Sequence, residues 1–286
     1  MKTFGTFHEA ISNAKFALFN QSSLVAPKTW QSVDVTAKPE MVTHEVQWWG
    51  FRVDLMIYGD GRLTNEDLHS HIGANQPWAD NHFNERVCGF PLNPGTEWAN
   101  WPYAKSADRF RVNDMFNHTY AERYWPRHAD PSCGGETKED YVDRLAKGTW
   151  PLQDNKGIRY DYGDLGDVIN QLEKDPSSRQ AVLPIFFPED TGAVHGERVP
   201  CSIMYQFMIR NGRLDLFYYL RSCDFVRHFR DDIYLTLRLQ CWVIEELQKR
   251  GMTALRPGNF LMQIASLHIF RNDWDVLFPD HPYQAS

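Results

Sequence analysis

Apolar residues recur at the spacing of an α-helix in three stretches of the chain. Side chains three or four positions apart share one face of a helix, so each stretch predicts a helix with one buried face. The stretches are an opening one that carries Phe7, Ile11, Phe16 and Phe19, a second at 164–174 before Pro176, and a long third at 233–249. Proline cannot continue a helix, which sets the expected end of the second one.

Strands are expected between these helices. Residues 181–187 and 260–270 are rich in β-branched and aromatic side chains, which is typical of strands. A further apolar-rich segment over 41–55 is expected to be buried on one side. With 286 residues, 42% of them hydrophobic, the chain can build a core and fits one large α/β domain or two small ones.

Residues 201–221 predict a β-hairpin. Two strand-like runs flank an Asn-Gly pair at 211–212, and both residue types tolerate the positive φ of a type I′ turn. Equal counting along both strands from this turn places Cys201 opposite Ser222, next to Arg221. A thiol and a guanidinium are therefore expected at the same end of the sheet.

A segment around 121–162 is expected to be a surface insertion. Its part from Trp125 to Tyr162 is rich in Pro, Gly, Asp and Lys, a composition that favours turns and loops. The sequence shows no repeat period and no low-complexity tract. We therefore interpret 1–286 as a single domain that carries one insertion.

Composition and charge exclude several classes of protein. No apolar run approaches the roughly 18 residues of a membrane span, and the N-terminus lacks a signal peptide's apolar centre, so a cytoplasmic location is expected. The net charge of −7 gives no general attraction for polynucleotides. The five cysteines are odd in number and contain no CxxC pair, which argues against a disulfide framework or a zinc site. No metal is expected.

Cys201 is the candidate nucleophile. An opposite charge within a few ångströms stabilises a thiolate, so Arg221 is expected to favour the ionised sulfur. A free cysteine is more often a small buried hydrophobe, and Cys223 keeps that interpretation. Pro200 and the polar cluster at 221–224 favour the nucleophile at position 201.

Arginines and carboxylates supply the other candidates. Arg221 and Ser222 offer donors that suit a phosphate dianion, and Arg179 is a second such arginine, although either arginine alone is more often a solvated surface charge. Glu45 stands among tryptophans and is a candidate general acid or base, with a salt-bridged structural carboxylate as the alternative. Asp232 belongs to an acidic pair before the long helix, where carboxylates commonly serve as caps.

Taken together, these motifs resemble the thymidylate synthase superfamily, from about Glu45 to His268. The segments that carry the resemblance are His44-Glu45 with Trp48, Tyr120 within Asn117-His118-Thr119-Tyr120, Asp175 to Arg179, Pro200-Cys201 with Gln206-Phe207, Asn211-Gly212, Arg221-Ser222-Cys223-Asp224, and Ser266-Leu267-His268. The resemblance implies an α/β (layered α+β) thymidylate synthase-like fold, with a mixed sheet packed with helices. It also implies a homodimer formed through the sheet.

The resemblance assigns a role to each candidate. Cys201 would attack carbon 6 of a pyrimidine nucleoside monophosphate, and carbon 5 would then take a one-carbon unit from the co-substrate 5,10-methylenetetrahydrofolate. Arg221 and Ser222 would hold the phosphate, and Arg179 would reach it from the partner subunit. The remaining implied roles are Glu45 for activating water, Gln206 for the substrate, His268 for the sugar, Tyr120 for the cysteine, Trp78 and Asp224 for the base and the folate, and His228 for the folate.

Asp232 would decide the base within this resemblance. Uracil-specific members carry an asparagine at that position, whereas a carboxylic acid can accept from the amino group of cytosine and donate its proton to N3. It could also take up negative charge when the thiolate adds to the ring. The phage deoxycytidylate hydroxymethylases are similar at this position and at Ser202. In those enzymes water, instead of hydride from the folate, adds to the methylene group attached to carbon 5. The expected function is hydroxymethylation of dCMP or CMP at carbon 5.

Departures from the family pattern leave alternatives open. His228 stands where the family has a glycine near the folate, and Phe270 replaces a tyrosine that contacts the 3′-hydroxyl. Gln180 replaces the second of two paired arginines, and Lys28 could supplement phosphate binding there. The sugar is therefore open between deoxyribose and the ribose of a CMP enzyme of nucleoside-antibiotic biosynthesis. Thymidylate synthesis on dUMP and an inactive nucleotide- or RNA-binding relative are further alternatives.

Overall fold

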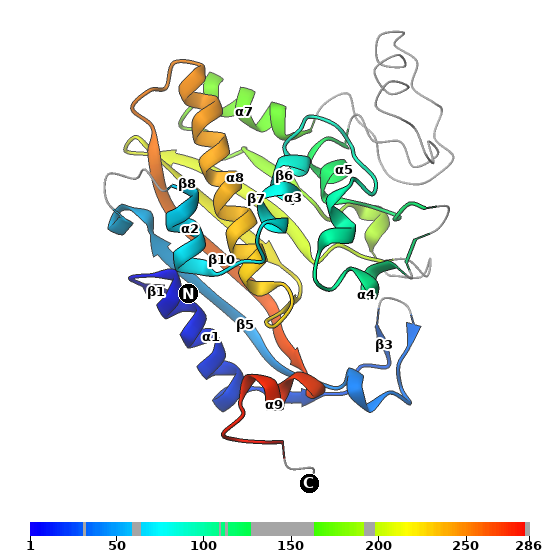
Figure 1. The fold of residues 1–286 in the computed structure, drawn as a ribbon. Coiled ribbons are helices and arrows are strands. Elements are labelled where there is room, and N and C mark those ends of the chain that lie inside the picture. Colours follow the sequence, from blue (N-terminus) through cyan, green and yellow to red (C-terminus); the bar gives the residue numbers. More distant parts are fainter. Residues whose placement is uncertain are drawn as a thin grey trace.

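A mixed sheet forms the centre of the fold in the computed structural model (Figure 1). The residues that the structure describes are 1–30, 33–58, 64–108, 110–111, 114–126, 163–191 and 198–283. Within them the sheet has eight strands, in the order β1-β5-β10-β8-β7-β6 with β2 beside β5 and β9 beside β10. The strands are β1 (Lys2–Phe4), β2 (Ser23–Val25), β5 (Thr43–Asp54), β6 (Val182–Pro184), β7 (Ser202–Arg210), β8 (Arg213–Leu220), β9 (Cys223–Asp224) and β10 (Arg256–Phe270).

Strand directions make the sheet mixed. The long central strand β10 is antiparallel to β5 and parallel to β8, and β7 is antiparallel to β8. A separate small sheet pairs β3 (Thr29–Trp30) with β4 (Val33–Asp34). The predicted α/β class, with a mixed sheet packed against helices, is confirmed.

Helices pack on the sheet, and α8 crosses one face of it with α2 and α3 beside it (Figure 1). The helices are α1 (Phe7–Gln21), α2 (Asn65–Ile72), α3 (Trp78–Arg86), α4 (Ala104–Asp108), α5 (Tyr120–Tyr124), α7 (Leu165–Lys174), α8 (Phe229–Lys249) and α9 (Trp274–Leu277). Single 3-10 turns lie at Pro39–Met41, Leu55–Tyr58, Glu97–Asn100, Pro188–Asp190 and Arg271–Asp273. No described helix is both long enough and apolar enough to cross a bilayer.

Helix α1 begins where the sequence provides a cap. The Thr6 side chain accepts from the backbone N–H of Glu9 at 3.1 Å, which satisfies one of the free donors of the first turn. Phe7 and Ile11 are buried as expected, but Phe16 is 58% exposed. Phe16 lies two and a half turns after Phe7 and therefore on the opposite side of the helix. The prediction that Phe16 belongs to the buried face is wrong.

The predicted hairpin is present with a different register at its open end. Arg210 pairs with Arg213 across the turn, but a bulge between Ser202 and Met204 shifts the pairing by one residue. The Arg221 backbone N–H consequently donates to the Cys201 carbonyl at 2.9 Å. Cys201 lies opposite Arg221, so the predicted pairing with Ser222 is wrong.

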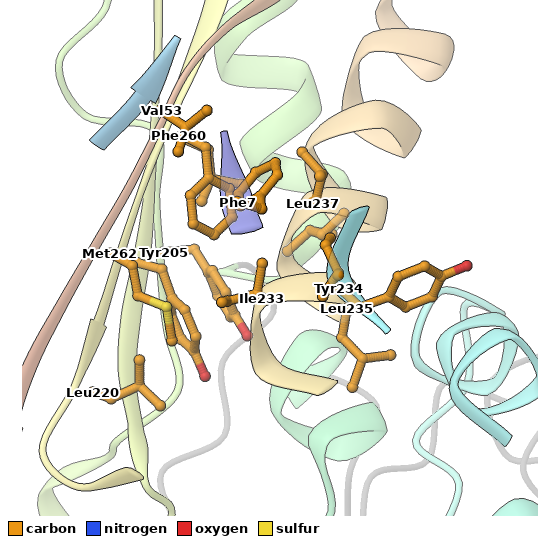
Figure 2. Close-up of a cluster of buried hydrophobic side chains, with 14 of the residues drawn as sticks. Phe7, Val53, Tyr205, Leu220, Ile233, Tyr234, Leu235, Leu237, Phe260 and Met262 are labelled. Atoms are coloured by element: carbon orange, nitrogen blue, oxygen red, sulfur yellow. The ribbon is translucent and has the colours of Figure 1, made fainter. Parts of the chain in front are cut away.

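The core lies between the sheet and α8 (Figure 2). Side chains alternate along β7 and β8, where every second residue is buried against the helices and its neighbours are less buried. Phe260 of β10 is fully buried and meets Phe7 edge-on with ring centroids 5.3 Å apart. Tyr205 and Tyr218 stack in the same layer at 4.5 Å.

The start of the expected surface insertion is part of the packed fold. Residues 121–125 are buried, and α5 begins with a capping box in which Thr119 and Glu122 bond each other's backbone N–H groups. The predicted insertion therefore cannot start at 121. Residues 127–162 lie outside the described residues, and the interpretation of 1–286 as one domain stays a prediction.

Candidate active site

A cavity of about 210 Å³ lies at the beginning of α8. It joins segments far apart in the sequence, including α3, the 97–100 turn, the start of α5 and the end of the hairpin. Six predicted site residues line it, namely Cys201, Asp232, Ser222, Tyr120, Trp78 and His228. The other six predicted residues, Glu45, Arg221, Asp224, His268, Gln206 and Arg179, are not among its lining residues. The candidate nucleophile and the carboxylate expected to read the base thus share one cavity.

Cys201 and Arg221 meet at the end of the hairpin. Nη2 of Arg221 lies 4.0 Å from Sγ of Cys201. Two backbone carbonyls hold the guanidinium, because Nε donates to Pro200 at 2.8 Å and Nη2 donates to Val199 at 2.9 Å. Burial raises the pKa of Cys201, and Arg221 acts in the opposite direction but more weakly. The expectation that the guanidinium makes the thiolate the favoured form is therefore wrong.

Asp232 is a carboxyl that titrates near neutrality. Burial raises its pKa to about 7, while Arg86 acts in the opposite direction. Oδ2 accepts from the Cys223 thiol at 3.4 Å, and among the described residues Asp232 makes no capping bond to the backbone of α8. Near pH 7 the group can therefore donate as an acid or accept as a carboxylate.

Tyr120 is held by a chain of hydroxyl groups. Its hydroxyl bonds with Oγ of Ser202 at 2.9 Å, and that Oγ bonds with the Tyr218 hydroxyl at 2.5 Å. Ser202 is fully buried, and burial raises the pKa of Tyr120 to about 12. Tyr120 is thus a neutral phenol fixed beside the strand that follows Cys201.

Glu45 forms a hydrogen-bonded cluster with Ser266 and Gln47 and is not among the lining residues of the cavity. It lies opposite His268 across β5 and β10. Oγ of Ser266 donates to Oε2 of Glu45 at 2.5 Å, and Gln47 donates to Oε1 at 3.2 Å. Of the two tryptophans that follow Glu45 in the sequence, Trp48 is 67% exposed and Trp49 is buried. A role for Glu45 in activating water and a role for His268 at the sugar stay predictions.

Asp224 is already engaged within the protein. Oδ1 accepts from the backbone N–H groups of Val226 and Arg227 at 2.9 and 3.1 Å, and Oδ2 accepts from Nη1 of Arg227 at 2.8 Å. Arg227 also pairs with Asp273 at 2.5 Å. Any ligand that Asp224 contacts must use the lone pairs these bonds leave.

Two stacked pairs line the aromatic part of the cavity. His228 stacks on Trp101 with ring centroids 4.7 Å apart, and His82 stacks on Trp78 at 4.8 Å. Burial lowers the pKa of both histidines to about 4, so both imidazoles are neutral at pH 7. The walls therefore offer flat, uncharged surfaces to an aromatic ligand.

Comparison with known proteins identifies the family. A family model for thymidylate synthase matches residues 31–278, which is most of the chain. The chain belongs to the thymidylate synthase family. The predicted superfamily and its fold are thereby confirmed.

Relatives in this family are distant. A Methanosarcina barkeri protein named "Putative thymidylate synthase" is 26% identical over 153 residues, which is 50% of this chain and 65% of that protein. Proteins of the same name from Methanosarcina acetivorans and Methanosarcina mazei are 26% and 28% identical, each over 52% of this chain and 68% of the relative. The match to the M. barkeri protein thus spans just under two thirds of that protein.

Two predicted residues of the thymidylate synthase pattern lie on the surface side of the sheet. Arg179 is exposed, and its backbone carbonyl accepts from Nε2 of Gln206 at 3.2 Å. Gln206 is half-buried between the buried Tyr205 and Phe207, so it faces away from α8. Their predicted contacts with a substrate stay predictions.

Sequence reasoning missed several residues that line the cavity. Arg86 comes from α3, Trp98 lies in the 97–100 turn, Trp101 follows that turn, and Arg198 precedes the hairpin. Closeness to the Pro-Cys motif was a signal for Arg198, and the Trp-x-x-Trp spacing was a signal for the tryptophans. Nothing near Arg86 in the sequence indicates chemistry, because only the packing of α3 brings it to the site.

Within the described ranges no three His, Cys, Asp or Glu side chains are grouped so as to hold a metal ion.

Proposed function

We propose that this chain is a pyrimidine nucleotide 5-hydroxymethyltransferase. It would convert dCMP or CMP, 5,10-methylenetetrahydrofolate and water into the 5-hydroxymethyl nucleotide and tetrahydrofolate. The observation that carries the proposal is the presence of Cys201 and Asp232 in one cavity, with the pKa of Asp232 near 7. A uracil edge offers N3–H and a carbonyl, whereas cytosine offers an N3 acceptor and an amino donor that a protonated carboxyl complements.

The chemistry begins at Cys201. Its sulfur adds to carbon 6, and the protonated Asp232 gives its proton to N3 as negative charge enters the ring. Because burial raises the pKa of Cys201, the thiol must give its proton to solvent during this addition, and the thiolate regains a proton when the adduct breaks down. Arg221, with Nη2 4.0 Å from the sulfur, stabilises the thiolate at that moment and again when the product leaves.

The phosphate and the dimer belong to the same proposal. Arg221 and Ser222 would bind the nucleotide phosphate, with Arg179 supplied by the partner subunit of a homodimer with shared sites. Two features support this arrangement: Arg179 is exposed, and apolar side chains such as Met204 and Phe217 are only half-buried on the sheet face that α8 does not cover. The binding partners would be small molecules and a second copy of the chain, with no polynucleotide and no membrane.

The co-substrate would bind against the aromatic walls. Trp78 and His228 are flat neutral surfaces in the cavity, which suits the ring system of a folate. Asp224 would contact the folate only through carboxylate lone pairs that do not already accept hydrogen bonds from Arg227. At the sugar, Phe270 packs edge-on against His268 at 5.7 Å and offers no hydroxyl, which keeps a CMP-specific enzyme as the alternative to a dCMP enzyme.

Thymidylate synthesis on dUMP is the second candidate, and the names of the Methanosarcina relatives favour it. One experiment separates the candidates. The protein is incubated with 5,10-methylenetetrahydrofolate and with dCMP, CMP or dUMP, and the products are weighed by mass spectrometry. Gain of a formaldehyde unit on a cytosine nucleotide supports the proposal, and methylated dUMP with release of dihydrofolate refutes it. The absence of any product would favour an inactive nucleotide-binding relative.

A further inference from the structure

Arg86 is a buried guanidinium that faces the cavity. It is the last residue of α3, its side chain lines the cavity, and the residue is only 5% exposed. Its Nε donates to Nε2 of His82 at 3.0 Å, and its guanidinium lies over the Tyr120 ring at 4.1 Å. These contacts fix the plane of the guanidinium without using its terminal nitrogens.

The terminal nitrogens of Arg86 form no salt bridge in the described part of the protein. Neither makes a hydrogen bond or an ion pair there, and each nitrogen keeps some solvent-accessible surface. At a side chain this buried, the remaining access is from the cavity. A buried charge without a partner is costly, so the position indicates an acceptor that arrives with the ligands.

The neighbours of Arg86 indicate where that acceptor lies. Its guanidinium lies 4.1 Å from the centre of the Tyr120 ring, its charge acts on Asp232, and Arg86, Tyr120, Asp232 and Cys201 line the same cavity. In the proposed reaction Asp232 reads carbon 4 of the base, and Cys201 attacks carbon 6. Carbon 5, where the one-carbon unit is attached, lies between those two ring atoms.

We propose that Arg86 binds the water oxygen that becomes the hydroxyl of the 5-hydroxymethyl product. This inference rests on the proposed function. A guanidinium cannot donate usefully to the amino group of cytosine, but it can orient a water lone pair and favour its hydroxide character. Arg86 would thus act after the one-carbon unit has reached carbon 5.

The step that Arg86 assists balances without a further reagent. The water oxygen forms a bond to the exocyclic methylene carbon, whose π electrons move into the ring. The bond between carbon 6 and sulfur breaks, and its electron pair leaves with the Cys201 thiolate. The proton that water loses neutralises that thiolate.

The test compares two stages of one reaction in Arg86→Gln. In a single turnover, with enzyme in excess over nucleotide, release of tritium from [5-³H]dCMP or [5-³H]CMP in the presence of 5,10-methylenetetrahydrofolate reports attack by Cys201 and attachment of the one-carbon unit. Formation of the hydroxymethyl nucleotide reports the attack of water. We expect product formation to fall by about 10²-fold, as for loss of one preorganised charged donor, with tritium release within about threefold of wild type.

Matched variants guard against a folding defect. Arg238→Gln removes another guanidinium from the same pair of helices, one that pairs with Asp80 of α3 outside the cavity lining, and it should slow both stages equally or neither. Arg86→Ala should regain product formation when guanidinium chloride is added at millimolar concentration, whereas a purely structural role gives no rescue. An equal fall of tritium release and product in Arg86→Gln, or a product rate within threefold of wild type, would overturn the assignment alone. A wild type that releases no tritium from either nucleotide would overturn the proposed function with it.

Discussion

Replacing Asp232 by Asn changes the hydrogen-bonding pattern that the cavity offers to the base while keeping its shape. Asp232 can donate at neutral pH because its pKa is about 7, and it can also accept. Asn keeps one acceptor and adds two permanent donors, which oppose the amino group of cytosine and suit the carbonyl of uracil. The perturbation should therefore move the preference from cytosine to uracil nucleotides.

The magnitude follows from one mismatched contact for each base. Leaving a buried polar group without its partner costs about 1–3 kcal/mol, which is roughly 5- to 150-fold in kcat/KM. We expect the loss with a cytosine nucleotide and the gain with dUMP to multiply. The ratio of the two kcat/KM values should then shift by about 10²-fold or more.

The assay measures tritium release from carbon 5 for dCMP, CMP and dUMP with wild type and Asp232→Asn. Asp231→Asn is the matched control, because Asp231 is held by the backbone N–H and the side chain of Asn75 at 2.9 and 2.8 Å and by Trp101 at 3.4 Å. Its base preference should stay within about twofold of wild type. An unchanged preference in Asp232→Asn would refute the assignment of Asp232 as the residue that reads the base.

Four further results are expected. Asp232→Asn should also stabilise the protein by at most about 4 kcal/mol above pH 7, because the folded carboxyl has a pKa of about 7 against an ordinary 3.8. This gain should shrink as pH falls and vanish below about pH 4, where the carboxyl is protonated in both states. Urea unfolding at each pH measures it, and a gain independent of pH would contradict the prediction. Alkylation of Cys201 by iodoacetamide, located by peptide mass, should be slow at pH 7 and should still be rising at about pH 9 without a plateau, because burial raises the pKa of that thiol above its ordinary value of 9.0. Arg221→Gln should slow this alkylation further at any pH in that range, since the guanidinium opposes the rise in pKa, and faster alkylation would reverse the assigned sign. Phe260→Ala should cost about 3–5 kcal/mol in urea unfolding, since the ring is fully buried against Phe7 and Phe51, and a loss below about 1 kcal/mol would show that the core is misplaced.

The hairpin and the helices could be predicted because their signals are local. An Asn-Gly turn between strand-like runs determined β7 and β8, and regular apolar spacing determined α7 and α8. The register at Cys201 could not be predicted, because the bulge between Ser202 and Met204 leaves no mark in the pattern of the strand. Phe16 shows a similar limit, since an aromatic residue near a helical period can still lie on the solvent side.

The site could be predicted in part, and the reason lies in how its residues are brought together. Cys201 and Asp232 stand in family motifs, and the fold brings both to the cavity. The placement of Glu45 depends on its pairing with β10, which the sequence around it does not reveal. Arg86 is on a helix whose packing against α8 is a tertiary event, so its position could not be derived from its own segment. The pKa of Cys201 was misjudged because burial, which outweighs Arg221, is not visible in the sequence.

The most direct test of the account is the covalent bond between Cys201 and the base. A nucleotide with fluorine at carbon 5 blocks release of the substituent and should trap the enzyme with the one-carbon unit attached. The protein is incubated with 5-fluoro-dCMP or 5-fluoro-CMP and 5,10-methylenetetrahydrofolate, digested, and mapped by mass spectrometry. The account predicts a stable adduct of nucleotide and folate on the peptide that carries Cys201, and no adduct in Cys201→Ser. An adduct on another cysteine, or none with either cytosine nucleotide while 5-fluoro-dUMP reacts at Cys201, would contradict it.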